Sequence, residues 1–227
     1  MLYTEQNVKD NIRNREGKRV FFLGKGDTLT PGARDYLSRQ RIPILPGEEA
    51  RIQTYKLLCG GTVSKKPEHM THLYGDVLVQ KTHPRIAFRG AVDALEAELV
   101  LCQLNCVGFR QELGEILTLA QRLISCDVLN EPVPEGKLCG LTEAEIRGHS
   151  HFPQEHYAQP HFMPEYTDGA AVLWLNRARC AARAAELAAV RAFVDAEGKP
   201  FREDILRAMN RMSSMLYILM IRAKKEE

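Results

Sequence analysis

Apolar residues recur every three or four positions in four long stretches of the chain, and this spacing predicts four long amphipathic helices. The stretches start close to Gly90, Leu113, Asp168 and Phe201. A fifth, shorter helix is predicted to start at Thr142, because Glu145 three residues later completes a capping box. The pattern therefore predicts a mainly α chain.

A small β-α-β appendage is predicted at the start of the chain. Residues 19–23 and 42–45 form short apolar runs that are typical of β-strands. Between them, Thr30 can cap a helix that has Pro31 at its first position. The glycines within 24–27 complete neither of the common phosphate-binding patterns, so this segment is predicted to be a turn.

The chain is predicted to divide into two parts. Glycine and proline at both ends of residues 46–61 are typical of a linker. The appendage and its linker make up residues 1–60, and a helical domain makes up residues 61–227. Within that domain, residues 62–85 lack periodicity and are predicted to form a flexible arm, which leads into the first long helix at Gly90.

The arm is rich in cations and hydroxyl groups. Its candidate ligands include Lys65, Lys66, Thr71, His72 and Lys81. Cations, hydroxyls and free backbone amides on a flexible segment suit polyphosphate binding. A solvated basic loop explains the lysines as well, and the composition leaves both interpretations open.

Asp93 is the residue that does not fit a plain amphipathic helix. If the helix starts at Gly90, Asp93 lies in its first turn, where the helix dipole favours a carboxylate. The same carboxylate could instead face a cation on another helix. The residue alone does not decide between these interpretations.

The two last long helices each carry a polar stripe. The stripes are Arg179, Arg183 and Glu186 on the third long helix, and Asn210, Ser214 and Tyr217 on the last. Two arginines four residues apart slightly destabilise an exposed helix, by ~0.2–0.5 kcal/mol, unless an anion lies between them. The first stripe is therefore either a solvated face or an anion site, and the second is either a set of interhelical hydrogen bonds or a ligand site.

Composition excludes several classes of function. The chain has 31 Lys and Arg against 29 Asp and Glu, a net charge of +2, so neither nucleic acid nor an anionic membrane is an obligatory partner. No apolar run is long enough for a membrane span, and the polar N-terminus lacks the apolar core of a signal peptide. We expect a cytoplasmic protein.

Cysteines and histidines offer two candidate metal sites. Cys102 and Cys106 are four residues apart on one predicted helix, and a loop carries His149, His151, His156 and His161. Neither spacing matches a standard metal site, so burial of the thiols and bonding of the histidines to the backbone are the favoured interpretations. No metal is predicted.

Three motifs resemble those of one enzyme family, in chain order. The pattern K-x-x-PRI-x(3)-G-x-x-D runs from Lys81 to Asp93, an arginine helix runs from Arg179 to Glu186, and the NRMSS segment starts at Asn210. They resemble motifs of the propanediol-utilisation type of ATP:cob(I)alamin adenosyltransferase. The KKPEHMTHL arm, the NEP turn and the LWLNRARCAARAAE helix are similar to its ethanolamine-utilisation branch.

The resemblance implies a fold and an activity. The fold is a homotrimer of five-helix bundles with an active site at each subunit interface. The activity is transfer of the 5′-deoxyadenosyl group from ATP, bound with Mg²⁺, to the cobalt of cob(I)alamin, which supplies adenosylcobalamin to ethanolamine ammonia-lyase. A reductase and a bacterial microcompartment are further implied surroundings. The alternative class is a non-catalytic corrinoid carrier or a helical scaffold.

The resemblance also implies roles for individual residues, and none of them is a catalytic nucleophile. The ATP ligands are Lys65, Lys66, Thr71, His72, Lys81, Arg183, Glu186 and Asn210. Asp93 and Arg179 form a salt bridge between subunits, and Leu123 and Ile124 contact cobalamin.

The chain departs from the family pattern in four places. The DELN segment is Asp93-Ala94-Leu95-Glu96, the last position of NRLSD is Ser214, and Ala184 replaces a second arginine. Some members of the ethanolamine branch also have clustered cysteines before the arm, associated with a divalent metal, where this chain has only Cys59. One cysteine cannot make such a site, so activity is expected to survive removal of transition metals.

Overall fold

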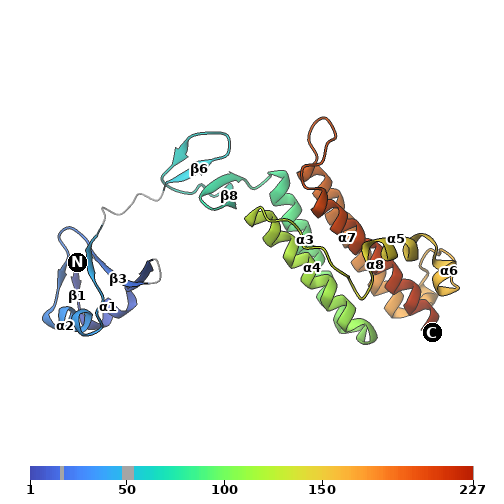
Figure 1. Cartoon of the computed structure of the whole chain (residues 1–227), viewed down its shortest axis with the longest axis horizontal. Helices are drawn as coiled ribbons and strands as arrows, with labels where there is room; N and C mark the ends of the chain where they lie inside the picture. The colour runs from blue at the N-terminus through green and yellow to red at the C-terminus, as the bar shows by residue number, and fades with distance from the viewer. Residues whose placement is uncertain (16–17, 48–53, 227) are drawn as a thin grey trace. The chain divides into compact units, whose positions relative to one another are not determined.

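The computed structural model describes residues 1–15, 18–47 and 54–226. The chain forms two compact units, Met1–Pro67 and Glu68–Glu227 (Figure 1). The predicted linker at 46–61 lies partly outside the described residues, at 48–53. The predicted domain boundary at residue 60 stays a prediction.

The first unit contains the β-α-β element that the sequence predicts. Strand β3 (Lys18–Leu23) pairs in parallel with β5 (Ile44–Pro46), and α2 (Pro31–Arg39) connects them. The Thr30 hydroxyl accepts a hydrogen bond from the Ala33 amide at 3.3 Å, which confirms the predicted cap. The core residues of this unit are Val8, Phe21, Ala33, Leu37 and Ile42.

Several short elements in this unit were not predicted. They are β1 (Leu2–Tyr3), α1 (Glu5–Asp10), β2 (Arg13–Arg15), β4 (Thr28–Leu29) and a hairpin of β6 (Tyr55–Leu57) and β7 (Thr62–Val63). Most are two or three residues long, too short to produce a recognisable period.

The second unit begins with a β-hairpin rather than an irregular arm. Strands β8 (Met70–Tyr74) and β9 (Val77–Gln80) pair antiparallel around a turn at Gly75, whose φ is +49°. Leu73 and Leu78 are buried, which anchors the hairpin. This hairpin was not predicted from the sequence, although the Gly-Asp turn between two short strands is itself a hairpin signal.

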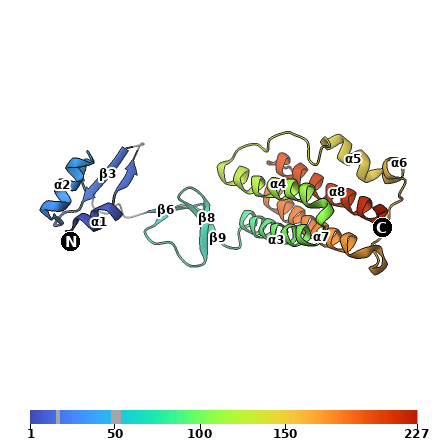
Figure 2. The ribbon, with the colours of Figure 1, turned by 90° about the horizontal axis from the view of Figure 1, so that it is seen from below.

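Four long helices form the bundle of this unit, as the apolar spacing predicts (Figure 2). They are α3 (Pro84–Asn105), α4 (Arg110–Leu129), α7 (Gly169–Phe193) and α8 (Glu203–Glu226). Helix α7 packs against both α3 and α8, and its buried positions are mostly alanine, which permits close approach. The rings of Phe88 and Phe193 meet edge to face at 5.2 Å in the core.

Helix α3 starts six residues earlier than the predicted start at Gly90. Pro84 occupies its first position, where the missing amide proton costs nothing, and His83 Nδ1 caps it by accepting from the Arg85 amide at 3.2 Å. Asp93 therefore lies more than two turns inside the helix. The interpretation of Asp93 as a first-turn, dipole-complementing residue was wrong.

Two short helices follow α4. The capping box of Thr142 and Glu145 opens α5 (Glu143–His151), as predicted. Helix α6 (Pro153–Tyr157) lies in the histidine-rich segment, where no helix was predicted, and a short 3-10 helix at Tyr166–Asp168 precedes α7. Helices α5 and α6 both pack on α8, and none of the described helices has the length and apolarity of a membrane span.

Candidate functional site

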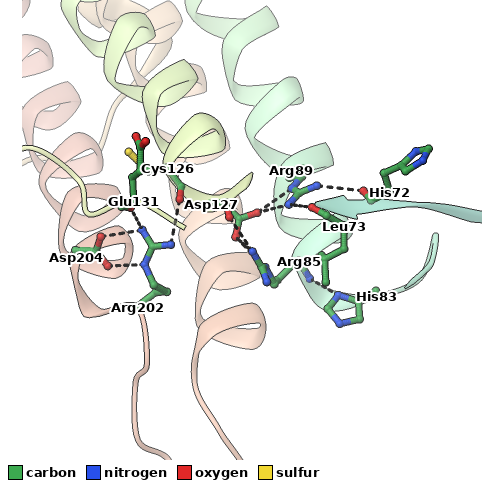
Figure 3. Close-up of polar contacts among 10 residues, drawn as sticks. All are labelled: His72, Leu73, His83, Arg85, Arg89, Cys126, Asp127, Glu131, Arg202 and Asp204. Atoms are coloured by element: carbon green, nitrogen blue, oxygen red, sulfur yellow. Dashed lines mark hydrogen bonds and ion pairs between the residues drawn. The ribbon is translucent and has the colours of Figure 1, made fainter. Parts of the chain in front are cut away.

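A buried ionic cluster joins the arm to the bundle at one end of α4 (Figure 3). Asp127, in the last turn of α4, is fully buried and is the only buried charged side chain among the described residues. Arg85 Nε and Arg89 Nε each donate to one of its carboxylate oxygens at 2.8 Å. Two guanidinium groups thus compensate one carboxylate away from water, where an unpaired charge would be costly.

The same two arginines contact the arm. Arg89 Nη2 donates to the backbone carbonyl of Leu73 at 2.7 Å, and Arg89 Nη1 donates to that of His72 at 3.4 Å. The Arg85 guanidinium lies 5.8 Å from the centre of the Tyr74 ring. Strand β8 is therefore attached to the first two turns of α3 through its backbone.

A second ion pair closes the same end of α4 without touching the arm. Arg202 donates to the carbonyl of Cys126 in the last turn of α4 at 3.3 Å and to that of Glu131, just beyond the helix, at 2.8 Å. Arg202 also donates to Asp204, and this bond lowers the pKa of Asp204 to about 2.

His83 is the titratable cap of α3, and its pKa is lowered. Burial is the largest cause, followed by the nearby positive charges of Arg85 and Arg89. Because Nδ1 accepts the capping bond, His83 must be neutral at that nitrogen to cap the helix.

We expect this cap to give the fold a pH dependence. The pKa of His83 in the folded protein lies below the ordinary histidine value of 6.5, so its contribution to stability is fully present above that pH. The contribution is lost as the pH falls through the folded pKa. The melting temperature of wild type and of His83→Asn, which keeps a capping acceptor but does not titrate, should be compared between about pH 7.5 and 5. Over this pH range the melting temperature of wild type should fall more than that of His83→Asn. Equal decreases in the two proteins would contradict the role of His83.

The arginine helix presents its two predicted site arginines differently. Arg179 is half-buried, and its guanidinium lies 5.3 Å from the centre of the Tyr217 ring. Arg183, one turn further along α7, is exposed. Within one subunit, the ion pairs of the described residues do not join Asp93 to Arg179, and Asp93 is exposed on α3. A pair between these two residues would therefore need a neighbouring subunit.

Glu186 and Asn210 meet between α7 and α8. Asn210 Nδ2 donates to Glu186 Oε1 at 2.8 Å, and the Ser213 hydroxyl donates to Glu186 Oε2 at 3.4 Å. Arg211 Nη2 donates to Asn210 Oδ1 at 2.6 Å. Two predicted ATP ligands, Glu186 and Asn210, are thus brought together. Asn210 makes an interhelical hydrogen bond in this structure, which is one of the two interpretations of its stripe.

The remaining predicted residues are spread over both units. Lys65 and Lys66 are exposed on the part of the arm that belongs to the first unit, while Thr71, His72 and Lys81 lie on the part that belongs to the second. Leu123 is fully buried in the bundle core, and Ile124 packs partly buried against that core. A corrin cannot touch Leu123 in this conformation, whereas Ile124 is partly accessible, and both corrin assignments stay predictions.

A pocket of about 900 Å³ opens between α4, the segment that follows it, α5 and α8. Leu119, Leu138, Ile146 and Arg211 are among its lining residues, and none of the predicted ATP or corrin residues lines it. Pocket size alone does not define a reactive site, so we place the candidate site at the motif residues on α3, α7 and α8.

The histidine and cysteine clusters have partners other than a metal. His149 Nδ1 lies 2.7 Å from the Tyr157 hydroxyl, and His161 Nδ1 lies 2.9 Å from that of Tyr217. The sulfurs of Cys102 and Cys106 are buried 3.7 Å apart. Across the part of the chain that the structure describes, no three His, Cys, Asp or Glu residues are grouped as metal ligands.

The fold of this chain matches that of a solved structure. A structure of a variant PduO-type ATP:corrinoid adenosyltransferase from Lactobacillus reuteri, complexed with cobalamin and ATP, matches with a TM-score of 0.53. The match covers 70% of this chain and 87% of that chain at 18% sequence identity, which establishes a shared fold.

Sequence comparison identifies the family. The cobalamin adenosyltransferase family matches residues 62–223, and the chain belongs to this family. Corrinoid adenosyltransferase EutT of Salmonella typhimurium (strain LT2) is 30% identical over 242 residues, which cover 96% of this chain and 90% of that protein. EutT of Escherichia coli (strain K12) is 28% identical with the same coverage. The resemblance seen in the motifs, including the ethanolamine-utilisation branch, is confirmed.

Proposed function

We propose that this protein transfers the 5′-deoxyadenosyl group of ATP to the cobalt of cob(I)alamin and supplies adenosylcobalamin to ethanolamine ammonia-lyase. The observation that carries the proposal is the family match over residues 62–223, which include the arm and nearly all of the bundle. The EutT relatives, which are similar over nearly the full chain, support the ethanolamine assignment. A reductase that delivers cob(I)alamin and a place in a microcompartment stay predictions.

The chemistry needs positioning rather than a protein nucleophile. The electron pair of cobalt(I) forms a bond to the 5′ carbon of ATP, while the bond from that carbon to oxygen breaks and its electrons leave with the phosphate chain. Mg²⁺ would enter with ATP, bound by the phosphate oxygens. The protein then has to align two substrates and stabilise the negative charge of the leaving phosphates.

Arg183 is the proposed phosphate ligand on the bundle. Its exposed guanidinium can donate two parallel bonds to phosphate oxygens. Glu186 and Asn210 lie on the same helix pair and are proposed to bind other parts of ATP. On the arm, Thr71, His72 and Lys81 are proposed to complete the site, together with Lys65 and Lys66.

A homotrimer is proposed from an exposed apolar face on α3. Val100 and Leu104 are 52% and 67% exposed, and they follow Asp93 at helical spacing on one side of the helix. On α7, Leu187 is 62% exposed and lies one turn from Arg183. Apolar side chains next to charged ones suit an interface between copies of the chain, in which Asp93 of one subunit meets Arg179 of the next.

The competing function is a non-catalytic corrinoid carrier or a helical scaffold. Anaerobic titration with chemically reduced cobalamin, first without ATP and then with it, separates these functions. A carrier would bind the corrinoid and leave its spectrum unchanged when ATP is added. A transferase converts the cob(I)alamin spectrum to that of a cobalt-alkyl species only after ATP is present.

A further inference from the structure

The ionic cluster at the base of the arm has no role in the chemistry proposed above. Asp127 accepts from Arg85 and Arg89 at both carboxylate oxygens, and Arg85 Nη2 also donates to the Asp127 carbonyl at 2.8 Å. A fully buried carboxylate with two cations is not required to close a helical bundle, since apolar residues of similar volume often serve equally well. The arrangement of the ionic cluster therefore indicates a role that an apolar contact could not fill.

Apolar side chains cannot hold a backbone strand by its carbonyl groups. Arg89 does so at His72 and Leu73, and it can reach both carbonyls because Asp127 holds its Nε and Nη2 at 2.8 and 2.6 Å. The hydrogen bonds on both sides of the planar guanidinium fix its orientation. Buried Leu73 anchors β8 through apolar contacts, while Arg89 fixes the two backbone carbonyls, and the orientation of Arg89 is in turn set by Asp127.

We propose that Asp127 and Arg89 are positioning residues that determine where the arm meets ATP. The inference rests on the proposed function, because Thr71 and His72 on β8 are proposed ATP ligands. Asp127 orients Arg85 and Arg89, and Arg89 fixes the carbonyls of β8 next to those ligands. The cluster contacts neither substrate; it acts through the strand.

If the cluster only stabilised the bundle, breaking it would lower stability without releasing β8. The chain offers a matched control for this alternative. Arg202 makes a comparable set of bonds at the same end of α4, to Cys126, Glu131 and Asp204, but it makes none to the arm. Arg89→Lys and Arg202→Lys each keep a positive charge and lose the planar fork. Both substitutions should lower the melting temperature, and only Arg89→Lys should release β8 from the bundle.

The first experiment compares steady-state kinetics of these two variants in the full-length protein. Arg89→Lys should raise the KM for ATP by about tenfold or more, while the KM for cob(I)alamin changes less than about twofold, because small misplacements of a binding element have large effects. Arg202→Lys should leave both KM values close to those of wild type. The proposal would be overturned if the KM for ATP changed equally in both variants. It would also be overturned if a folded Arg89→Lys protein had an unchanged KM for ATP.

A second measurement does not depend on activity. Amide hydrogen exchange in β8 and β9, followed without substrates, should be faster in Arg89→Lys and in Asp127→Asn than in wild type, and unchanged in Arg202→Lys. Unchanged protection of β8 in Arg89→Lys would refute the role of Arg89 even if the protein proved to have another activity. If exchange responds as expected but wild type transfers no adenosyl group, the proposed function fails and the attachment of the arm stands.

Discussion

Asp93→Arg is expected to dissociate the proposed homotrimer, and adding Arg179→Asp to the same chain should restore it in part. Each single change leaves like charges facing one another at the proposed interface, which costs on the order of 2–5 kcal/mol if the interface is dry. The double change places opposite charges together again. Sedimentation velocity at micromolar concentration measures the result.

A matched control is available on the same helix. Glu96 is also a carboxylate of α3, but it forms a hydrogen bond with Gln121 within its own subunit. Glu96→Gln should leave the oligomer intact. If the double variant assembled no better than either single variant, the pairing of Asp93 with Arg179 would be wrong, although the exposed apolar face of α3 would still need a partner.

Arg183→Ala should raise the KM for ATP by about tenfold to a hundredfold and lower turnover, without changing the oligomeric state. Hydrogen bonds to charged groups contribute about 1.5–3 kcal/mol, and a bidentate guanidinium makes two of them to phosphate. Arg183→Lys should recover only part of the loss, because an ammonium group cannot donate in the same parallel geometry. Kinetics with ATP as the varied substrate test this expectation.

Arg191 provides the comparison for Arg183. It is an exposed arginine two turns further along α7 and has no proposed role in the site. Arg191→Ala should leave the KM for ATP near the wild-type value. If both alanine variants shifted the KM equally, the effect would be one of overall charge, and Arg183 would not be a specific phosphate ligand.

Local sequence signals predicted most of the fold, because they act over a few residues. The apolar spacing located the four long helices, and the capping box at Thr142 located α5. Pro84 was interpreted as the end of an extended segment, although proline is equally suited to the first position of a helix. That one choice moved the start of α3 to Gly90 and placed Asp93 wrongly in a first turn.

The ionic cluster at the base of the arm could not be predicted in the same way. Asp127 is 42 residues from Arg85 and 38 from Arg89 in sequence, so only the fold brings them together. Arg85 lies within the PRI motif, but nothing local indicates its partner. The meeting of Glu186 with Asn210 depends likewise on how α7 packs against α8, whereas Arg183 could be selected from its spacing and from the family motif.

Transfer of a labelled carbon tests the central claim most directly. ATP carrying ¹³C at its 5′ position is incubated anaerobically with the protein and excess cob(I)alamin, and the corrinoid product is analysed by NMR and mass spectrometry. The proposed function predicts that the label appears on a carbon bonded to cobalt, with one phosphate chain released for each corrinoid converted. Bound corrinoid that stays unlabelled, with all of the label retained in ATP, would contradict it.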